Sequence, residues 1–278
     1  MSARVDPAVQ AIEVDLCLDA VHRRYGYDFR SYSRPSITRR LNRRAEGEGV
    51  SSISALTERL LHDPSTLDRL LLDLSVNVTS MFRDPGFFSS FRRRVVPVLR
   101  TYPFVRIWNA GCATGEETFS LAILLEEAGL RERSRIYATD INERVLDVAA
   151  AGAFPLRRMR DYTDNYLRSG GTGVFSEYYT VEGERACFRP DLVDNVVFAQ
   201  HNLVSDMSFN EFHAIICRNV MIYFDRPLQE RVLRLFADSL VPFGILGLGQ
   251  KETIRFSGLA TEFSELDAKE RLYRRVPA

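Results

Sequence analysis

The feature that most constrains the fold is a glycine-rich turn between an apolar run and a helix-forming segment. Residues 104–109 are rich in strand formers, and the chain then reads AGCATGEETFSLA up to Ala122. A strand, a tight glycine turn and a helix in this order are typical of open α/β domains, whose ligands bind outside the carboxyl ends of the strands. Gly111 allows close approach of the backbone to a ligand, and Gly115 opens the helix. This turn is therefore the first candidate binding site.

The C-terminal part of the chain repeats this alternation of strand and helix. Strands are expected at 104–109, Ser134–Asp140, Asn195–Gln200, His213–Cys217 and Ile245–Leu248, and helices at Phe119–Glu127, Arg144–Ala151 and Pro227–Leu240. Such alternation predicts an α/β fold with a doubly wound, mostly parallel sheet. Residues 153–194 interrupt the pattern, because YYTVEGERACF predicts a hairpin around Glu182-Gly183. We therefore expect a small antiparallel β insertion there.

The N-terminal part has helical periodicity instead. Apolar side chains recur at helical spacing over 54–61, and Asp63-Pro64-Ser65 is a helix-start signal with proline in the first turn. We expect a small all-α domain over 1–75 and a linker over 76–103. The α/β domain is expected over 104–278.

Charge is balanced over the whole chain but not locally. The 37 Lys and Arg residues match the 37 Asp and Glu residues, so no global charge indicates a nucleic-acid partner. The stretch from His22 to Arg44 is strongly basic, with eight arginines. Most charge runs are solvated faces, and the rest of the chain lacks the aromatic and basic interleaving that would favour nucleic acid.

Cysteine usage and hydropathy indicate the class of protein. The cysteines are Cys17, Cys112, Cys187 and Cys217. They have no metal-ligand spacing, so we expect reduced thiols and no metal. No charged-then-apolar leader opens the chain and no apolar run approaches about 18 residues, so a soluble cytoplasmic protein without membrane insertion is expected. No strong apolar surface stripe stands out, and a monomer is the default expectation.

Acidic residues beside the glycine turn indicate what it holds. Asp140 ends the second strand, where a carboxylate can accept hydrogen bonds from both ribose hydroxyls of a nucleoside. Glu116 and Glu117 at the helix N-terminus would repel a pyrophosphate but attract an ammonium or sulfonium group. They could also simply complement the helix dipole. A cationic adenosyl ligand is favoured, and an NAD-dependent oxidoreductase remains a weaker alternative because no acid for a hydride site stands out.

Five motifs occur in a fixed order along the chain: LSVNVTSMFRDPGFF (74–88), WNAGCATGEETFSLA (108–122), YATDINERVLDVA (137–149), HNL (201–203) and ICRNVMIYFD (216–225). With these motifs the chain resembles the CheR family of chemotaxis-type protein-glutamate O-methyltransferases, which use S-adenosylmethionine. The resemblance implies a helical N-terminal domain and a Rossmann-like methyltransferase domain with a β insertion. It also implies methyl transfer to glutamate carboxylates of methyl-accepting chemotaxis receptors or related signalling proteins, with S-adenosylhomocysteine as product.

The resemblance further implies roles for individual residues. The implied cofactor-binding residues are Asn77, Thr79, Arg83, Gly111, Glu117, Asp140, Asn202, Leu203, Arg218 and Asn219. Among them Glu117 matches the ligand of the methionine portion, Asp140 the ribose-binding acid, and Asn202-Leu203 the dipeptide that meets the adenine.

Two residues are the implied catalytic groups, and a basic cluster is implied in substrate binding. Arg83 would hold the incoming carboxylate, and Tyr223 would orient it or contact the methyl group. Glutamate is already ionised near neutral pH, with a reference pKa of about 4.3, so no general base is required. Catalysis should come from positioning in a site that excludes water. The arginines Arg39, Arg40, Arg43 and Arg44 are implied to form one helix face that meets an acidic helical substrate.

The chain departs from the family pattern at three places. A GHSE-like motif is replaced by Gly249-Gln250-Lys251-Glu252, the usual FF pair by Met81-Phe82, and an alanine of many members by Gly111. None removes an implied catalytic group. The first lies on the active-site side, and it motivates a second hypothesis: a non-catalytic module that binds S-adenosylmethionine or its demethylated product and engages a partner through the basic helix.

Overall fold

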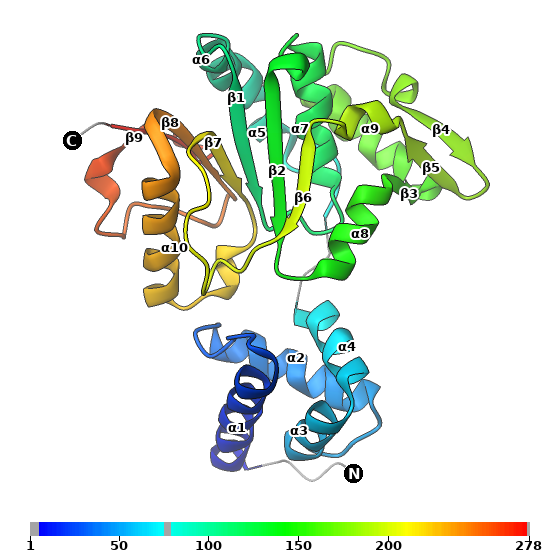
Figure 1. The fold of residues 1–278 in the computed structure, drawn as a ribbon, viewed down its shortest axis with the longest axis vertical. Helices are drawn as coiled ribbons and strands as arrows, with labels where there is room; N and C mark the ends of the chain where they lie inside the picture. The colour runs from blue at the N-terminus through cyan, green and yellow to red at the C-terminus, as the bar shows by residue number, and fades with distance from the viewer. Residues whose placement is uncertain (1–5, 75–78, 277–278) are drawn as a thin grey trace. The chain divides into compact units, whose positions relative to one another are not determined.

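The structure is a computed structural model that describes residues 6–74 and 79–276. The chain divides into two compact units. Figure 1 colours the chain from blue at the N-terminus to red at the C-terminus. The helical unit comprises Met1–Val76 with Tyr223–Gln229, and the sheet unit comprises Asn77–Ile222 with Glu230–Ala278. No helix within the described ranges is long and apolar enough to cross a membrane.

Over its described residues 6–74, the helical unit is built from consecutive α-helices. They are α1 (Pro7–Tyr25), α2 (Arg34–Gly47), α3 (Ile53–His62) and α4 (Pro64–Leu74). Their boundaries follow local signals: the Asp6 side chain caps α1 by accepting from Ala8 N, and Gly26 ends it with a φ of +81°. The Ser52 side chain caps α3 by accepting from Ala55 N. One buried apolar face on each helix builds the core of this unit.

A short segment from the C-terminal half of the sequence completes the helical unit. Tyr32 and Phe224 form an antiparallel bridge, and Asp225 N donates to Ser31 O at 2.9 Å. The rings of Tyr32 and Phe224 also meet edge to face, with centroids 5.1 Å apart. The helical unit is therefore not contiguous in sequence.

The sheet unit contains a seven-stranded sheet in the order β6-β2-β1-β7-β8-β10-β9, visible in Figure 1. The strands are β1 (Val105–Ala110), β2 (Ser134–Asp140), β6 (Val196–Gln200), β7 (Phe212–Cys217), β8 (Leu240–Leu248), β9 (Phe263–Asp267) and β10 (Leu272–Arg275). The first five in spatial order pair in parallel, whereas β10 pairs antiparallel with both β8 and β9. The expected mostly parallel α/β fold is confirmed, and the antiparallel pair at the chain end is an addition.

Buried strands and helices explain why this sheet forms. All six residues of β7 are buried, as expected for a parallel strand covered on both faces. The connecting helices are α7 (Glu116–Glu127), α8 (Glu143–Ala151) and α10 (Arg226–Ser239). The expected linker over 76–103 contains, within its described residues, α5 (Pro85–Ser90), η1 (Phe91–Val95) and α6 (Val96–Leu99). Phe82, Phe88 and Phe91 are fully buried in the main core cluster, so this segment is part of the sheet unit's core.

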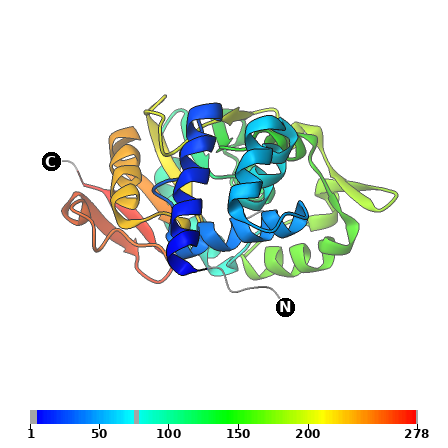
Figure 2. The ribbon, with the colours of Figure 1, turned by 90° about the horizontal axis from the view of Figure 1, so that it is seen from below.

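The expected antiparallel insertion is confirmed. Its strands β3 (Ala153–Pro155), β4 (Tyr179–Glu182) and β5 (Arg185–Phe188) form a separate sheet in the order β3-β5-β4, next to α9 (Met159–Arg168) in the sequence. The β4–β5 hairpin extends away from the central sheet (Figure 1 and Figure 2). Phe154 and Phe188 pack edge to face on Phe119 of α7, which anchors the insertion to the sheet unit.

Candidate cofactor and methyl-transfer site

The glycine turn lies at the carboxyl end of β1 and is tied to β2. Gly111 has a φ of +74°, and its N–H donates to Thr139 O at 2.8 Å, as does Cys112 N at 2.9 Å. A Cβ on Gly111 would lie 2.4 Å from Val220 Cγ2. Both the positive φ and this close approach require glycine, so the backbone here is bare on the side that faces the loop after β7.

Asp140 closes the same turn from the end of β2. Its Oδ2 accepts from Ala113 N at 3.0 Å and its Oδ1 from Asn142 N at 3.0 Å. Burial raises the pKa of this carboxyl, and the backbone donors at residues 142, 113 and 141 oppose that rise. A carboxylate has about four acceptor positions, so each oxygen keeps capacity for a ligand hydroxyl. The buried, pre-oriented acid fits a ribose.

Glu116 and Glu117, expected as a pair of acids, point to different partners. Glu116 is buried and accepts from Thr114 Oγ1 at 2.6 Å and from Tyr162 Oη at 3.1 Å. Glu117 accepts from Asn109 Nδ2 at 2.9 Å. Its other oxygen lies 2.6 Å from an Arg218 guanidinium nitrogen. Both carboxylates are therefore engaged by side chains of the protein. Only Glu117 contacts Arg218, which follows β7.

Arg218 is the centre of that network. Its side chain is 1% exposed and makes ion pairs with Glu117 at 2.6 Å and with Asp84 at 2.7 Å. It also donates to the carbonyl of Arg83 at 3.0 Å, and its guanidinium lies 4.2 Å from the centroid of the Phe87 ring. Arg218 thus links the glycine-turn helix to the segment before α5, and it acts on the site by holding these parts together.

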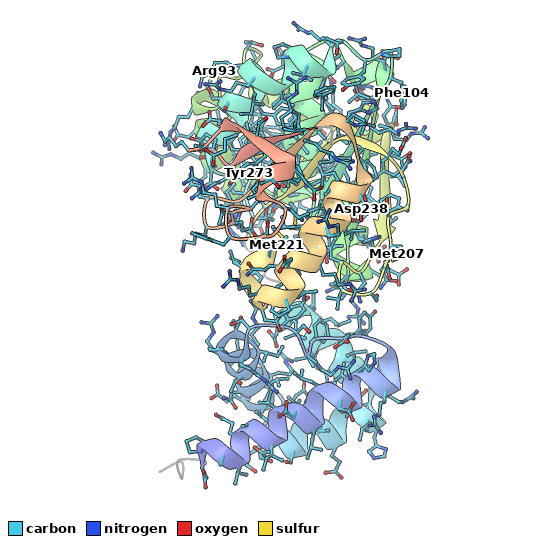
Figure 3. All side chains as sticks on the ribbon, turned by 90° about the vertical axis from the view of Figure 1, so that its left-hand side faces the viewer. Arg93, Phe104, Met207, Met221, Asp238 and Tyr273 are labelled. Carbon is cyan, nitrogen blue, oxygen red and sulfur yellow. The ribbon has the colours of Figure 1, made fainter. Side chains whose placement is uncertain are left out.

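The loop after β7 is held by a residue that the sequence analysis did not single out. Glu252 accepts hydrogen bonds from four backbone N–H groups: those of Asn219, Val220, Met221 and Gly249. Figure 3 labels Met221, which precedes in sequence the helix carrying Asp238. The one feature of the sequence that could have pointed to Glu252 is its position, because it ends the Gly249–Glu252 stretch that follows a predicted strand.

The dipeptide Asn202-Leu203, which is expected to meet the adenine, follows β6 at the same edge of the sheet as Asp140. His201 N donates to Asp140 O at 3.1 Å, which ties the end of β6 to the end of β2. Asn202 then folds the following turn, because its Oδ1 accepts from Val204 N at 2.9 Å and its own N–H donates to Asp206 Oδ2 at 2.8 Å. Leu203 is buried. Gly111, Asp140 and the 202–203 turn therefore line one end of the parallel strands.

The N-terminal motif is only partly described. Asn77 lies outside the described residues. Thr79 O accepts from an Arg158 guanidinium nitrogen at 2.7 Å, and Arg83 N donates to Ser80 O at 3.2 Å. The backbone of Arg83 is thus held from both sides, through Ser80 and Arg218. The role of its side chain in binding a carboxylate remains a prediction.

Tyr223 belongs to the helical unit. Its carbonyl accepts from Ser33 N at 2.8 Å, and the guanidinium of Arg40 lies 4.4 Å from its ring centroid. Burial lowers the pKa of Arg40, and the neighbouring Tyr223 partly offsets this. The role of Tyr223 beside the transferring methyl remains a prediction.

The four arginines of α2 do not share one exposed face, so that expectation is wrong. Arg39 and Arg43 are exposed and line a groove along α2 together with Arg34 and Glu46. In contrast, Arg40 is buried.

Arg40 and Arg44 are held inside the helical unit. Arg40 donates to the carbonyls of Asp73 and Leu74. Arg44 pairs with Asp73 at 2.6 Å and with Glu48 at 3.0 Å. The reason is geometric: successive helical residues are rotated by about 100°, so positions 39 and 43 face solvent while 40 and 44 face α4.

The donor set at this edge of the sheet fits an adenosyl ligand. Within residues 6–74 and 79–276, no group of three or more His, Cys, Asp or Glu side chains could hold a metal ion. The bare turn at Gly111, the buried acid Asp140 and the 202–203 turn provide close backbone approach, a ribose acceptor and a partly apolar wall.

Comparison with known proteins agrees with this geometry. Residues 77–271 match the CheR methyltransferase SAM-binding domain, and residues 12–75 match the CheR methyltransferase all-alpha domain. The chain is 46% identical over 264 residues to the Pseudomonas putida protein named Cher3, covering 95% of this chain and 97% of that protein.

Two chemotaxis protein methyltransferases are more distant relatives. Chemotaxis protein methyltransferase 2 of Pseudomonas aeruginosa is 34% identical over 222 residues, covering 77% of this chain and 76% of that protein. The chemotaxis protein methyltransferase of Salmonella typhimurium is 31% identical over 254 residues, covering 88% of this chain and 84% of that protein.

Proposed function

Because this chain belongs to the CheR methyltransferase family and carries its S-adenosylmethionine-binding domain, we propose that it methylates glutamate side chains of signalling proteins. The products are glutamate methyl esters and S-adenosylhomocysteine, and the substrates are methyl-accepting chemotaxis receptors or related proteins. One observation supports this most directly: Asp140 and Glu117 flank the same bare glycine turn, and Arg218 holds Glu117 in place.

The cofactor is S-adenosylmethionine, and the strand ends offer a place for each of its parts. Asp140 would accept from the ribose hydroxyls, and Asn202-Leu203 would line the adenine. Glu117 would receive the ammonium of the methionine portion, because a carboxylate shared with Arg218 still keeps acceptor capacity. Asn77, Thr79 and Asn219 would complete the pocket.

Methyl transfer to a carboxylate requires no proton transfer by the protein. Bound S-adenosylmethionine supplies an electrophilic methyl group on a sulfonium. The substrate glutamate is ionised near neutral pH, with a reference pKa of about 4.3, so the chain needs no base. Arg83 would hold the incoming carboxylate in line, and the Tyr223 phenol would orient it. Orientation and exclusion of water are then the sources of rate.

The substrate surface is proposed on α2, in a narrower form than expected from the sequence. Arg39 and Arg43 face solvent along the groove and can form bidentate contacts with acidic side chains of a helical substrate. Arg40 and Arg44 are assigned to the internal packing of the helical unit. We propose that the protein acts in the cytoplasm as a monomer and binds no nucleic acid.

A labelling experiment tests the proposal. The purified protein is incubated with methyl-labelled S-adenosylmethionine and membrane or soluble fractions of its own organism. Base-labile label on a membrane protein is expected for a chemoreceptor, and base-labile label on a soluble protein indicates another signalling substrate. Absence of base-labile label in both fractions, despite binding of S-adenosylhomocysteine, would contradict methyl-ester formation and favour the non-catalytic binding module.

Two variants then separate catalysis from binding. Arg83→Ala and Tyr223→Phe should both lose labelling. Tyr223→Phe should bind S-adenosylhomocysteine within about tenfold of the parent, since it changes a group assigned to the substrate carboxylate alone, whereas Arg83→Ala should also weaken that binding because Arg83 is assigned to the cofactor as well. Arg93→Ala, which removes an exposed arginine of the neighbouring segment, is the matched control and should label normally. Full labelling by both site variants would refute their assigned roles.

A further inference from the structure

One carboxylate organises the loop that carries the site residues after β7. Glu252 Oε2 accepts from Gly249 N at 2.6 Å and from Asn219 N at 3.0 Å. Its Oε1 accepts from Val220 N at 2.9 Å and from Met221 N at 2.8 Å. A carboxylate has about four acceptor positions, so the backbone occupies all of them. The side chain is therefore committed to the loop and is not a ligand for anything else.

The loop has the conformation that such a carboxylate requires. Asn219 has a φ of +61°, in the left-handed region, and three successive N–H groups from Asn219 to Met221 converge on one anion. Successive backbone N–H groups in such a conformation form a concave anion-binding site. Here a residue of the same chain occupies that site. Glu252 is buried, which raises the pKa of its carboxyl, and the four backbone donors act in the opposite direction.

The loop so held touches two parts of the cofactor site. Directly before it, Arg218 makes the ion pairs with Glu117 and Asp84. Within it, the Val220 side chain fills the space beside Gly111 that a Cβ would need. Any shift of the loop would therefore move the Arg218 backbone on one side and release the glycine turn on the other.

The same contacts explain the Gly249–Glu252 stretch. A Cβ on Gly249 would lie 2.7 Å from Glu252 Oε2 and 2.8 Å from Asn219 N, so only glycine fits. Gln250 and Lys251, which replace the two central residues of the GHSE-like motif, are exposed. Gly249 and Glu252, which form the contacts with the loop, are both retained. The changed residues Gln250 and Lys251 are therefore no argument against catalysis.

We propose that Glu252 is a positioning residue for the cofactor site, which it serves by fixing the backbone of Asn219–Met221. The inference rests on the proposed function for its consequence in methyl transfer, but the loop clamp itself can be tested without turnover. An isosteric Glu252→Gln change places an amide NH₂ donor against backbone N–H donors. At least two of the four hydrogen bonds are then lost.

The test compares Glu252→Gln with Glu127→Gln. Glu127 is a matched control because its largely buried carboxylate also accepts backbone N–H groups, from Thr172 and Gly173 at 3.0 Å each. It holds a loop of the β insertion instead of the loop after β7. Both variants should unfold at lower temperature than the parent.

Two readouts distinguish positioning from a merely structural role. Amide hydrogen exchange at residues 219–221 should speed up in Glu252→Gln and not in Glu127→Gln. At a temperature where both variants are folded, the Kd for S-adenosylhomocysteine should rise about tenfold or more in Glu252→Gln and stay within about twofold in Glu127→Gln.

Three results have separate meanings. Unchanged exchange at 219–221 in Glu252→Gln would overturn the clamp. Faster exchange with an unchanged Kd would show that the loop is held but does not position the cofactor, which also overturns the proposal. A parent protein that fails to bind S-adenosylhomocysteine would contradict the proposed function, while the exchange comparison would still decide on the clamp.

Discussion

Val220 occupies the space that a side chain at Gly111 would need, with its Cγ2 only 2.4 Å from the position of a Cβ at residue 111. The two residues are far apart in sequence, one in the turn after β1 and the other in the loop after β7. Their contact closes the gap between the two central strand ends of the cofactor site. Gly111 is therefore coupled to the loop that Glu252 holds.

This contact predicts a partial rescue. Gly111→Ala should weaken binding of S-adenosylhomocysteine by about tenfold or more, because the Cβ collides with Val220 and alanine disfavours a φ of +74°. Val220→Ala alone should cost little affinity. The double variant should regain part of the loss, since only the collision is relieved. Isothermal titration of the parent, the two single variants and the double variant with S-adenosylhomocysteine gives the coupling free energy between residues 111 and 220. Strictly additive changes in binding free energy would contradict the contact.

Arg218 should be essential for stability as well as for binding. Arg218→Ala leaves Glu117 and Asp84 without their cation in a largely buried setting, and should lower the free energy of unfolding by about 3 kcal/mol or more. The control is Arg234→Ala, which breaks a 2.8 Å pair with Glu262 at the surface and should cost within about 1 kcal/mol. Urea denaturation measures both. Equal losses would argue against the central role of Arg218.

The two pairs of α2 arginines should behave differently. Reversing charge at Arg39 and Arg43 should leave the melting temperature nearly unchanged and raise the apparent KM for an acidic protein substrate, with a weaker effect in high salt. Replacing Arg40 and Arg44 by alanine should instead destabilise the helical unit, because the carbonyls at the end of α4 and the carboxylate of Asp73 lose their donors. Substrate titrations and thermal melts together check this division. Reversed phenotypes would refute it.

Glu48 makes the stability of the helical unit dependent on pH. Hydrogen bonds from Arg69, together with those from Arg44, lower the pKa of Glu48 to about 2 against the opposing effect of burial. Because the folded-state pKa lies below the unfolded one, the stabilisation is present at neutral pH. It is lost as pH falls from about 5 towards 2.

The corresponding variant should show that dependence directly. Glu48→Gln should lower the melting temperature near neutral pH, and its difference from the parent should shrink as the solution is acidified. Glu46→Gln, on the exposed face of the same helix, is the control and should track the parent throughout. If the difference in melting temperature between Glu48→Gln and the parent stayed constant between neutral pH and acid, the ion pairs of Glu48 would not be its cause.

Much of the α/β unit is encoded locally in the sequence. Strand β2 begins and ends where expected, and β1 and β6 do so to within one residue, because buried parallel strands read as short apolar runs between turn signals. Strands β9 and β10 were not predicted. Their residues FSELD and LYRR mix charged with apolar side chains, and the pairing of β10 with β8 and β9 supplies what this weak pattern lacks.

The candidate site divides in the same way. By itself the sequence determined which residues stand at the strand ends, since Gly111 and Asp140 each follow directly from a strand pattern. Only the tertiary structure decided which side chains meet there. The Arg218–Glu117 pair joins residues 101 positions apart, and Glu252 reaches back 33 residues to Asn219. The strand pattern is local because burial follows the alternation of each element, whereas such pairs form only once the chain has brought separate loops to one edge of the sheet.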